Sequence, residues 1–117
     1  MLTAKETKEK FKAEPRNWKV WLMDFVDDFR RHKDSSAIEQ PFSLDNERLD
    51  AILASTIETL CDESKTPIPD WLYAIPSCKN PYFVAEEDDL MATAIVESPV
   101  RFRLRKVFVM ENFLSRV

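Results

Sequence analysis

Hydrophobic side chains recur at steps of three and four residues along two long stretches of the chain. In residues 17–33 they form an aromatic stripe made of Trp18, Trp21, Leu22, Phe25, Val26 and Phe29. In residues 44–63 they form an aliphatic stripe made of Leu49, Ile52, Leu53, Ile57 and Leu60. This spacing is that of an amphipathic helix, so we predict two long helices with Asn17 and Ser43 as their N-caps.

Weaker patterns predict shorter helices elsewhere. Residues 86–97 open with four carboxylates, which suit the positive end of a helix, and Pro99 follows their apolar stripe. Residues 1–15 are rich in Lys and Glu and predict either a short charged helix or a loose arm, ended in both cases by Pro15. A further one or two helical turns are expected around Trp71, between two prolines.

The last segment, residues 98–117, has a different period. Basic and apolar side chains alternate at its start, in the order Arg101, Phe102, Arg103, Leu104 and Arg105. Alternation predicts a β-strand, and Val107–Met110 continues it with β-type residues. We therefore predict a mostly α fold: a single domain over residues 1–117, a small helical bundle with an extended basic and apolar tail. For this tail the sequence leaves both a short strand and coil open.

The composition changes this picture mainly through two residue types, glycine, which is absent, and histidine, which occurs once. None of the 117 residues is glycine, which excludes the glycine-dependent dinucleotide turn, the phosphate-binding loop and the nucleophile elbow. Helices are then expected to end at Asn or before proline, because glycine is absent from the left-handed C′ position. A single histidine, His32, excludes multi-histidine metal centres. We expect no cofactor and no metal.

No catalytic set can be assembled from the remaining polar residues. His32 lies among cations near the end of the first long helix, where a solvated role is expected. Asp24 and Asp28 share a helix face, but that face lies beside the aromatic stripe and predicts solvent-exposed carboxylates. An enzyme built on these residues would need them in one cleft. We therefore expect a protein that is not an enzyme.

Charge, cysteines and hydropathy indicate a cytoplasmic protein. The net charge is −4, yet residues 101–117 carry five basic side chains and one acidic one. Cys61 and Cys78 lack the C-x-x-C spacing of redox or zinc motifs and are expected to be free thiols. The first residues have no apolar core of a signal peptide, and no run of about 18 apolar residues predicts a membrane span.

The tail carries the clearest candidate binding site. On a strand its three arginines would share one face while its apolar residues dock on the core, and arginine grips carboxylates and phosphates well. The arginines could instead pair with the acidic remainder of the chain, bind a protein partner, or bind nucleic acid. The candidate partner-binding residues are Arg101, Phe102, Arg103, Arg105, Phe108, Phe113 and Trp71.

Two segments resemble a group of small uncharacterised bacterial proteins of about this length. Residues 98–117, with Phe102-x-x-Arg105-Lys106-Val107-Phe108-Val109, are similar to their F-x-x-R-N-x-F-V ending, except that Lys106 replaces Asn. Residues 68–71 are similar to their (I/V)-P-x-W step. The match covers residues 66–117 and implies a bacterial cytoplasmic protein. Some members of the group resemble partners encoded beside toxin-like proteins, and no catalytic residue is carried over.

Two functions remain open at this stage. The first is a non-enzymatic protein-interaction module, binding another protein or a second copy of itself, with a toxin-like protein as one candidate partner. The alternative is a nucleic-acid-binding regulator that uses the tail or the basic cluster at residues 30–33. The acidic majority of the chain favours the first.

Overall fold

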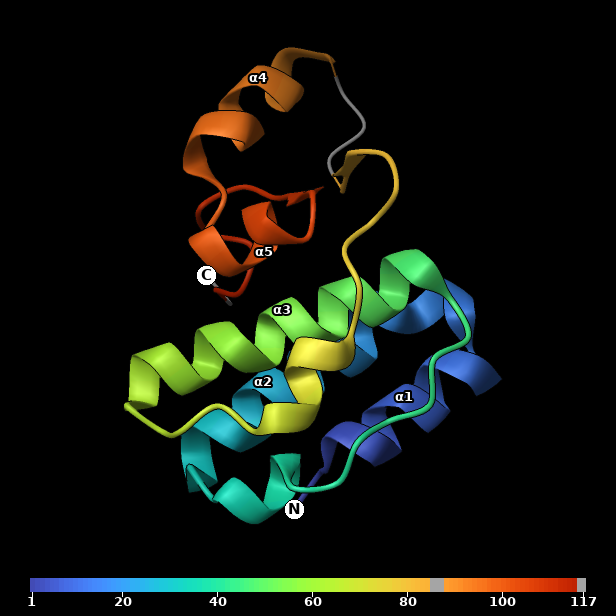
Figure 1. Cartoon of the computed structure of the whole chain (residues 1–117), viewed down its shortest axis with the longest axis vertical. Helices are drawn as coiled ribbons and strands as arrows, with labels where there is room; N and C mark the ends of the chain where they lie inside the picture. The colour runs from blue at the N-terminus through green and yellow to red at the C-terminus, as the bar shows by residue number, and fades with distance from the viewer. Residues whose placement is uncertain (85–87, 116–117) are drawn as a thin grey trace.

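The chain folds mostly as α-helices packed around one long central helix (Figure 1). This computed structural model describes residues 1–84 and 88–115. Over the described residues the α-helices are α1 (Ala4–Ala13), α2 (Trp18–His32), α3 (Glu47–Ser64), α4 (Asp88–Glu97) and α5 (Val100–Leu104). Three 3-10 helices are η1 (Pro15–Asn17), η2 (Ser35–Ile38) and η3 (Asp70–Ala74), and two short strands are β1 (Tyr82–Phe83) and β2 (Val107–Phe108). The predicted mostly α fold is confirmed.

The charged N-terminal stretch is a helix and not a loose arm. Thr3 accepts a hydrogen bond from the Glu6 N–H at 3.0 Å, and the Glu6 carboxylate accepts one from the Thr3 N–H at 3.1 Å. This capping box satisfies two backbone donors at the start of α1. Phe11 is buried, and so is Lys8, which pairs with the buried Asp50 of α3. The helix is therefore part of the packed structure.

The two long helices lie close to their predicted positions, but their ends differ from expectation. Asn46, not Ser43, caps α3, and its side-chain oxygen accepts a hydrogen bond from the Leu49 N–H at 3.1 Å. Neither Asn nor proline ends α2 and α3. Both end at lysines in the left-handed conformation, Lys33 with φ 50° and Lys65 with φ 57°. Lysine tolerates this conformation at a modest energetic cost and brings a cation to the negative end of each helix.

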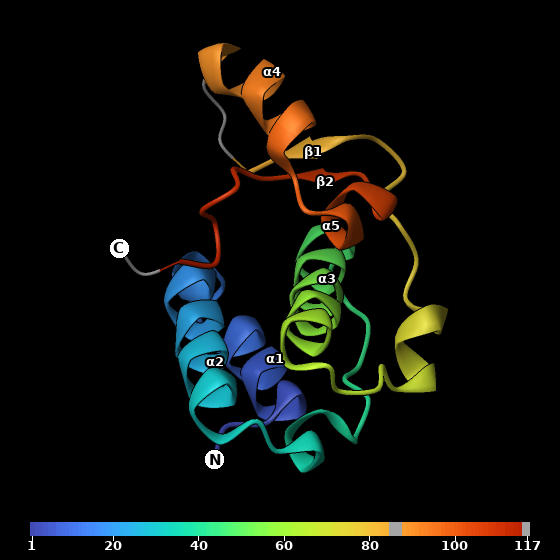
Figure 2. The ribbon, with the colours of Figure 1, turned by 90° about the vertical axis from the view of Figure 1, so that its left-hand side faces the viewer.

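The core lies between α3 and the elements around it. Figure 2 shows α1 and α2 beside α3, while α4, α5 and the strands stand beyond one side of α3. Both predicted stripes contribute buried residues, including Phe25, Phe29 and Ile57. The same apolar cluster continues into the C-terminal segment through Phe102 and Val109. The tail is thus built into the core.

The strand predicted over residues 100–105 is wrong. Val100–Leu104 forms the helix α5, and only Val107–Phe108 is a strand, which pairs in parallel with β1 so that Tyr82 lies opposite Val107. A helix places Phe102 in the core and puts Arg101 and Arg105 one turn apart, facing α3. There they meet Asp62 and Glu58, which are also one turn apart. These tertiary contacts outweigh the local alternation of side chains.

Candidate functional site

The predicted partner-binding arginines do not form one face. Arg105 is buried and donates to the Glu58 carboxylate, to the Leu72 carbonyl oxygen at 2.9 Å and to the Ile75 carbonyl oxygen at 3.4 Å. A buried guanidinium whose donors are used in this way holds α3, η3 and the C-terminal segment together. Arg105 is therefore buried among contacts within the chain, and it is not accessible as the expected partner contact.

The other two arginines also differ from each other. Arg101 donates to both Asp62 oxygens, from Nε at 2.9 Å and from Nη2 at 3.1 Å. The hydrogen bond to Asp62 raises the pKa of Arg101 above its ordinary value. Arg103 is exposed, and none of the ion pairs among the described residues involves it. Of the three candidate arginines, Arg103 is therefore the one whose side chain is accessible to a partner.

The candidate aromatic residues pack inside the molecule. Phe102 is fully buried and contacts Phe113, whose ring centroid lies 5.8 Å away. Phe108 stacks on Phe83 at 5.0 Å. Trp71 donates from Nε1 to the Ile38 carbonyl oxygen at 3.0 Å, which ties η3 to η2. These contacts place all four candidate aromatic residues in packed positions, with Phe102 fully buried and Phe108, Phe113 and Trp71 partly exposed.

Of the polar residues considered for catalysis, the structure brings His32 and Asp28 together, one turn apart on α2, and neither borders the hollows described below. His32 is exposed at the end of α2, with Nε2 3.5 Å from Asp28, and Asp28 accepts a hydrogen bond from the Leu2 N–H. Cys61 and Cys78 are free and buried, and burial raises the pKa of the Cys61 thiol to about 11. Such a thiol is a poor nucleophile at neutral pH.

A different set of residues forms an open apolar surface on α4 and α5. Its exposed fractions are 48% for Ile95, 76% for Val96, 55% for Val100 and 66% for Leu104. These four residues define what we call the α4–α5 face. Ile95 and Val96 lie on α4 and Val100 and Leu104 lie on α5, where Val100, Arg103 and Leu104 share one side of the helix. The face thus combines aliphatic side chains with one exposed guanidinium.

A shallow hollow extends this surface toward η3. It has a volume of about 370 Å³ and is bordered by Leu104, Arg101, Tyr73 and Pro76. Tyr73, which is 67% exposed, adds an aromatic ring to the border of this hollow. The α4–α5 face and this hollow give a partner both apolar area and a place for a protruding side chain.

Sequence reasoning missed the α4–α5 face because it treated the apolar stripe of residues 86–97 as the buried side of a helix and predicted residues 100–105 to be a strand. One signal was present. The stretch Leu90–Val96 is apolar at nearly every position, and a helix that is apolar all round needs cover on more than one side. In the structure the molecule covers one side of α4, and Ala94 is buried there.

Comparisons with protein-family models, with curated proteins and with solved structures gave no match to this chain. Among the described residues, no helix is both long and apolar enough to cross a bilayer. No cluster of three or more His, Cys, Asp or Glu side chains in the described ranges could hold a metal ion. The surface of the molecule is therefore the basis for a functional proposal.

Proposed function

We propose that the protein is a protein-interaction module and that the α4–α5 face is its docking surface. The observation that carries this proposal is the concentration of exposed aliphatic side chains over residues 95–104. Val20 and Leu44 are also exposed, but they lie singly on other elements, as apolar residues often do on protein surfaces. A group of adjacent exposed aliphatic residues is typical of interaction sites.

The charge beside this surface indicates the kind of partner. Arg103 lies on the same side of α5 as Val100 and Leu104. Lys106, three residues after Arg103, is also exposed. Both groups would be desolvated at least in part by a docked protein, which favours carboxylates opposite them. We therefore expect a partner that presents an apolar helix or loop bordered by Asp or Glu. A toxin-like protein with such a surface is one candidate.

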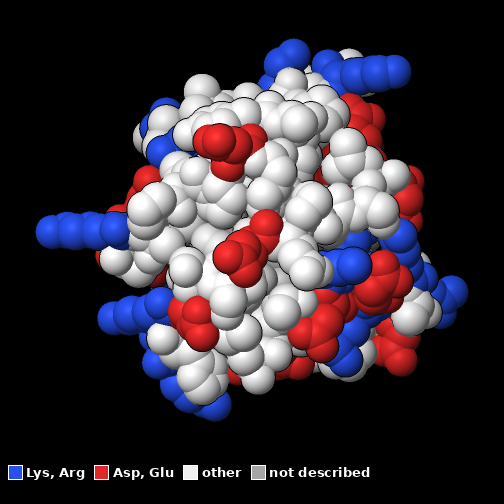
Figure 3. Space-filling view, turned by 60° about the horizontal axis from the view of Figure 1, so that its bottom comes forward, with Lys and Arg blue, Asp and Glu red and all other residues white. Residues whose placement is uncertain are grey.

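The structure supports nucleic-acid binding less well. Of the basic groups on which that alternative rests, Arg105 is buried, Arg101 pairs with Asp62, and Arg30 pairs with Glu63. Figure 3 views the molecule from another side, where Lys and Arg project mainly around the edge and Asp and Glu interrupt the uncharged surface. A continuous basic surface is the feature that phosphate binding requires.

Site-specific photo-crosslinking tests the proposal. A photoreactive phenylalanine analogue is placed at Val96, and in a matched control at Val20, which is 54% exposed on α2. After irradiation in cells of the source organism, we expect an adduct at position 96 that is absent at position 20. The same adducts at both positions, or none at position 96, would contradict the proposal.

A charge reversal then tests the role of Arg103. Arg103→Glu should reduce the yield of the position-96 adduct, because it places a carboxylate opposite the carboxylates expected on the partner. Arg16→Glu reverses an exposed charge on η1 and should leave the yield unchanged. Once the partner is purified, Val96→Asp should weaken its binding by more than about tenfold, as expected for the centre of an apolar interface. A covalent homodimer would identify a second copy as the partner.

A further inference from the structure

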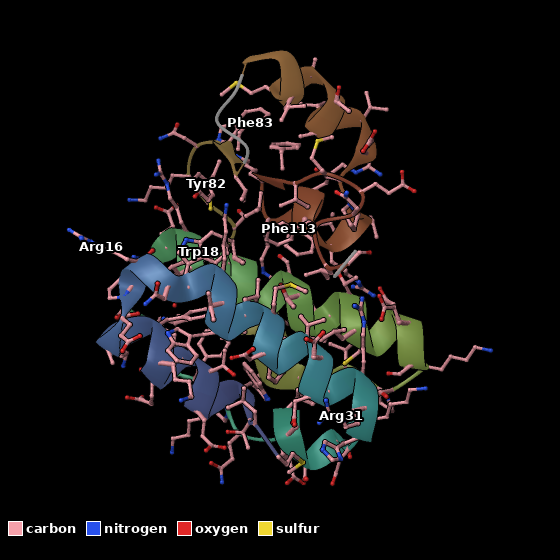
Figure 4. The ribbon with its side chains drawn as sticks, turned by 180° about the vertical axis from the view of Figure 1, so that it is seen from behind. Arg16, Trp18, Arg31, Tyr82, Phe83 and Phe113 are labelled. Atoms are coloured by element: carbon pink, nitrogen blue, oxygen red, sulfur yellow. The ribbon has the colours of Figure 1, made fainter. Side chains whose placement is uncertain are left out.

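A second apolar depression lies between α2 and the chain that follows β2. It has a volume of about 260 Å³, and we call it the α2 groove. Its apolar lining consists of Leu22, Met23, Val84, Val109, Met110 and Phe113, with Lys19 and Asn112 as its polar residues. Figure 4 shows this side of the molecule, with Trp18 on α2 near Phe113, and their ring centroids are 6.3 Å apart.

The lining of the α2 groove suits a protruding side chain of a partner. Leu22 and Val109 are buried and form its floor, whereas Met23, Met110 and Phe113 are partly exposed and form its walls. The volume is small compared with pockets for drug-sized ligands, which usually exceed about 300 Å³, so one or two side chains would fill it. Methionine walls adapt readily to side chains of different shape.

A second hollow adjoins the groove and carries negative charge. It has a volume of about 400 Å³ and shares Met110 and Asn112 with the α2 groove, while Glu97 and Glu111 belong to this hollow alone. The Glu97 carboxylate accepts a hydrogen bond from the Glu111 N–H at 3.2 Å, which keeps it beside Glu111. The combined depression therefore has Lys19 in its apolar part and two carboxylates in the adjoining part.

Glu97 lies at a position that is unfavourable for a carboxylate. Glu97 is the last residue of α4, where the negative end of the helix dipole disfavours a carboxylate. None of the ion pairs among the described residues involves Glu97 or Glu111. A lysine or arginine of a partner would relieve the unfavourable interaction of Glu97 with the helix dipole.

We propose that the α2 groove binds a short amphipathic helical segment of a partner protein. Two apolar side chains one turn apart enter the groove, and a Lys or Arg of the same segment lies between Glu97 and Glu111. This is the mode in which amphipathic helices dock in apolar grooves. A free acidic ligand does not fit, because the two carboxylates would repel it. The site uses none of the four residues that define the α4–α5 face, and it takes a partner segment of the opposite charge.

Selection from a random peptide library tests the proposal on the full chain. A phage-displayed library of random dodecapeptides is panned against the immobilised protein, and a fluorescein-labelled consensus peptide is then titrated by fluorescence polarisation. We expect enriched peptides to share two apolar residues three or four positions apart and a nearby Lys or Arg. No enrichment, or a consensus rich in Asp and Glu, would overturn the proposal.

Substitutions in the protein then show where the selected peptide binds. The double change Glu97→Gln and Glu111→Gln keeps the hydrogen-bonding oxygen of residue 97 and should weaken binding about five- to tenfold at low salt. Glu39→Gln removes an exposed charge far from the groove and should have no effect. Met110→Lys should abolish binding, with thermal melting by circular dichroism as the check on folding.

One further variant separates this proposal from the preceding one. Leu104→Asp changes the α4–α5 face at a residue of α5 and should leave peptide binding unchanged. If Leu104→Asp abolishes binding while Met110→Lys and the glutamine variants do not, the peptide binds the α4–α5 face and the α2 groove proposal is overturned. If the α4–α5 face yields no crosslinked partner but the peptide results hold, the groove proposal stands alone.

Discussion

At the scale of single residues, buried charges decide how the C-terminal segment is held. Arg105 and Glu58 are both buried and pair across 47 positions of sequence. A buried ion pair stabilises little compared with apolar residues, but removal of one partner leaves an uncompensated charge in the core. Sequence alone could not reveal this pair, because an arginine in a basic run has the composition of a surface residue, and its partner lies far away along the chain.

Arg105 and Arg103 should therefore differ sharply when each is truncated. Arg105→Ala leaves the Glu58 carboxylate buried without its partner and should lower the free energy of unfolding by about 3–5 kcal/mol. Arg103→Ala removes an exposed side chain and should change it by less than about 0.5 kcal/mol. Urea denaturation of the full chain measures both. The double variant Arg105→Met with Glu58→Leu should recover most of the loss, whereas equal effects of the two alanine variants would contradict the assigned roles.

At the scale of elements, the sequence predicted which segments are helices better than where they begin and end. The apolar stripes of α2 and α3 could be recognised because a long helix repeats the same spacing of buried side chains over several turns. The segment around Arg101–Arg105 is too short for its period to be decisive, and its contacts with Glu58 and Asp62 lie outside any local window. The N-cap of α3 was misplaced for a related reason. Asp50 accepts hydrogen bonds from the backbone of Asp45 and Asn46, which delays the start of the helix.

The cap assignment can be tested by comparing two alanine variants. Asn46→Ala removes the acceptor for the Leu49 N–H and should lower the free energy of unfolding by about 0.5–2 kcal/mol. The Ser43 hydroxyl instead accepts from the exposed Lys12 ammonium, so Ser43→Ala should cost less than about 0.5 kcal/mol. Thermal and urea unfolding measure both variants. A larger loss for Ser43→Ala would restore the cap that the sequence predicted.

At the scale of the whole molecule, burial is unevenly divided between the helices. Eleven of the 18 residues of α3 are buried. Among the α4 side chains that the structure describes, only Ala94 is buried. The candidate sites follow this division. Both the α4–α5 face and the hollow beside Glu97 use residues of α4, the helix with the least cover. The sequence could not show this, because the apolar content of α4 predicts burial and only the packed structure shows which side lacks a neighbour.

The same division predicts a gradient of local stability. The free energy of local opening depends on how many buried contacts a segment loses, so amides of α3 should exchange with solvent at a rate set by global unfolding. Amides of α4 should exchange much faster, through an opening that leaves the α1–α3 core intact. Hydrogen exchange read by NMR measures both helices in one sample, with α2 as an internal reference. Equal protection of α3 and α4 would show that α4 is as firmly held as the core. If a partner crosslinked through Val96 is then added in purified form, slower exchange in α4 with no change in α1 would place the docking surface where the exposed aliphatic residues indicate.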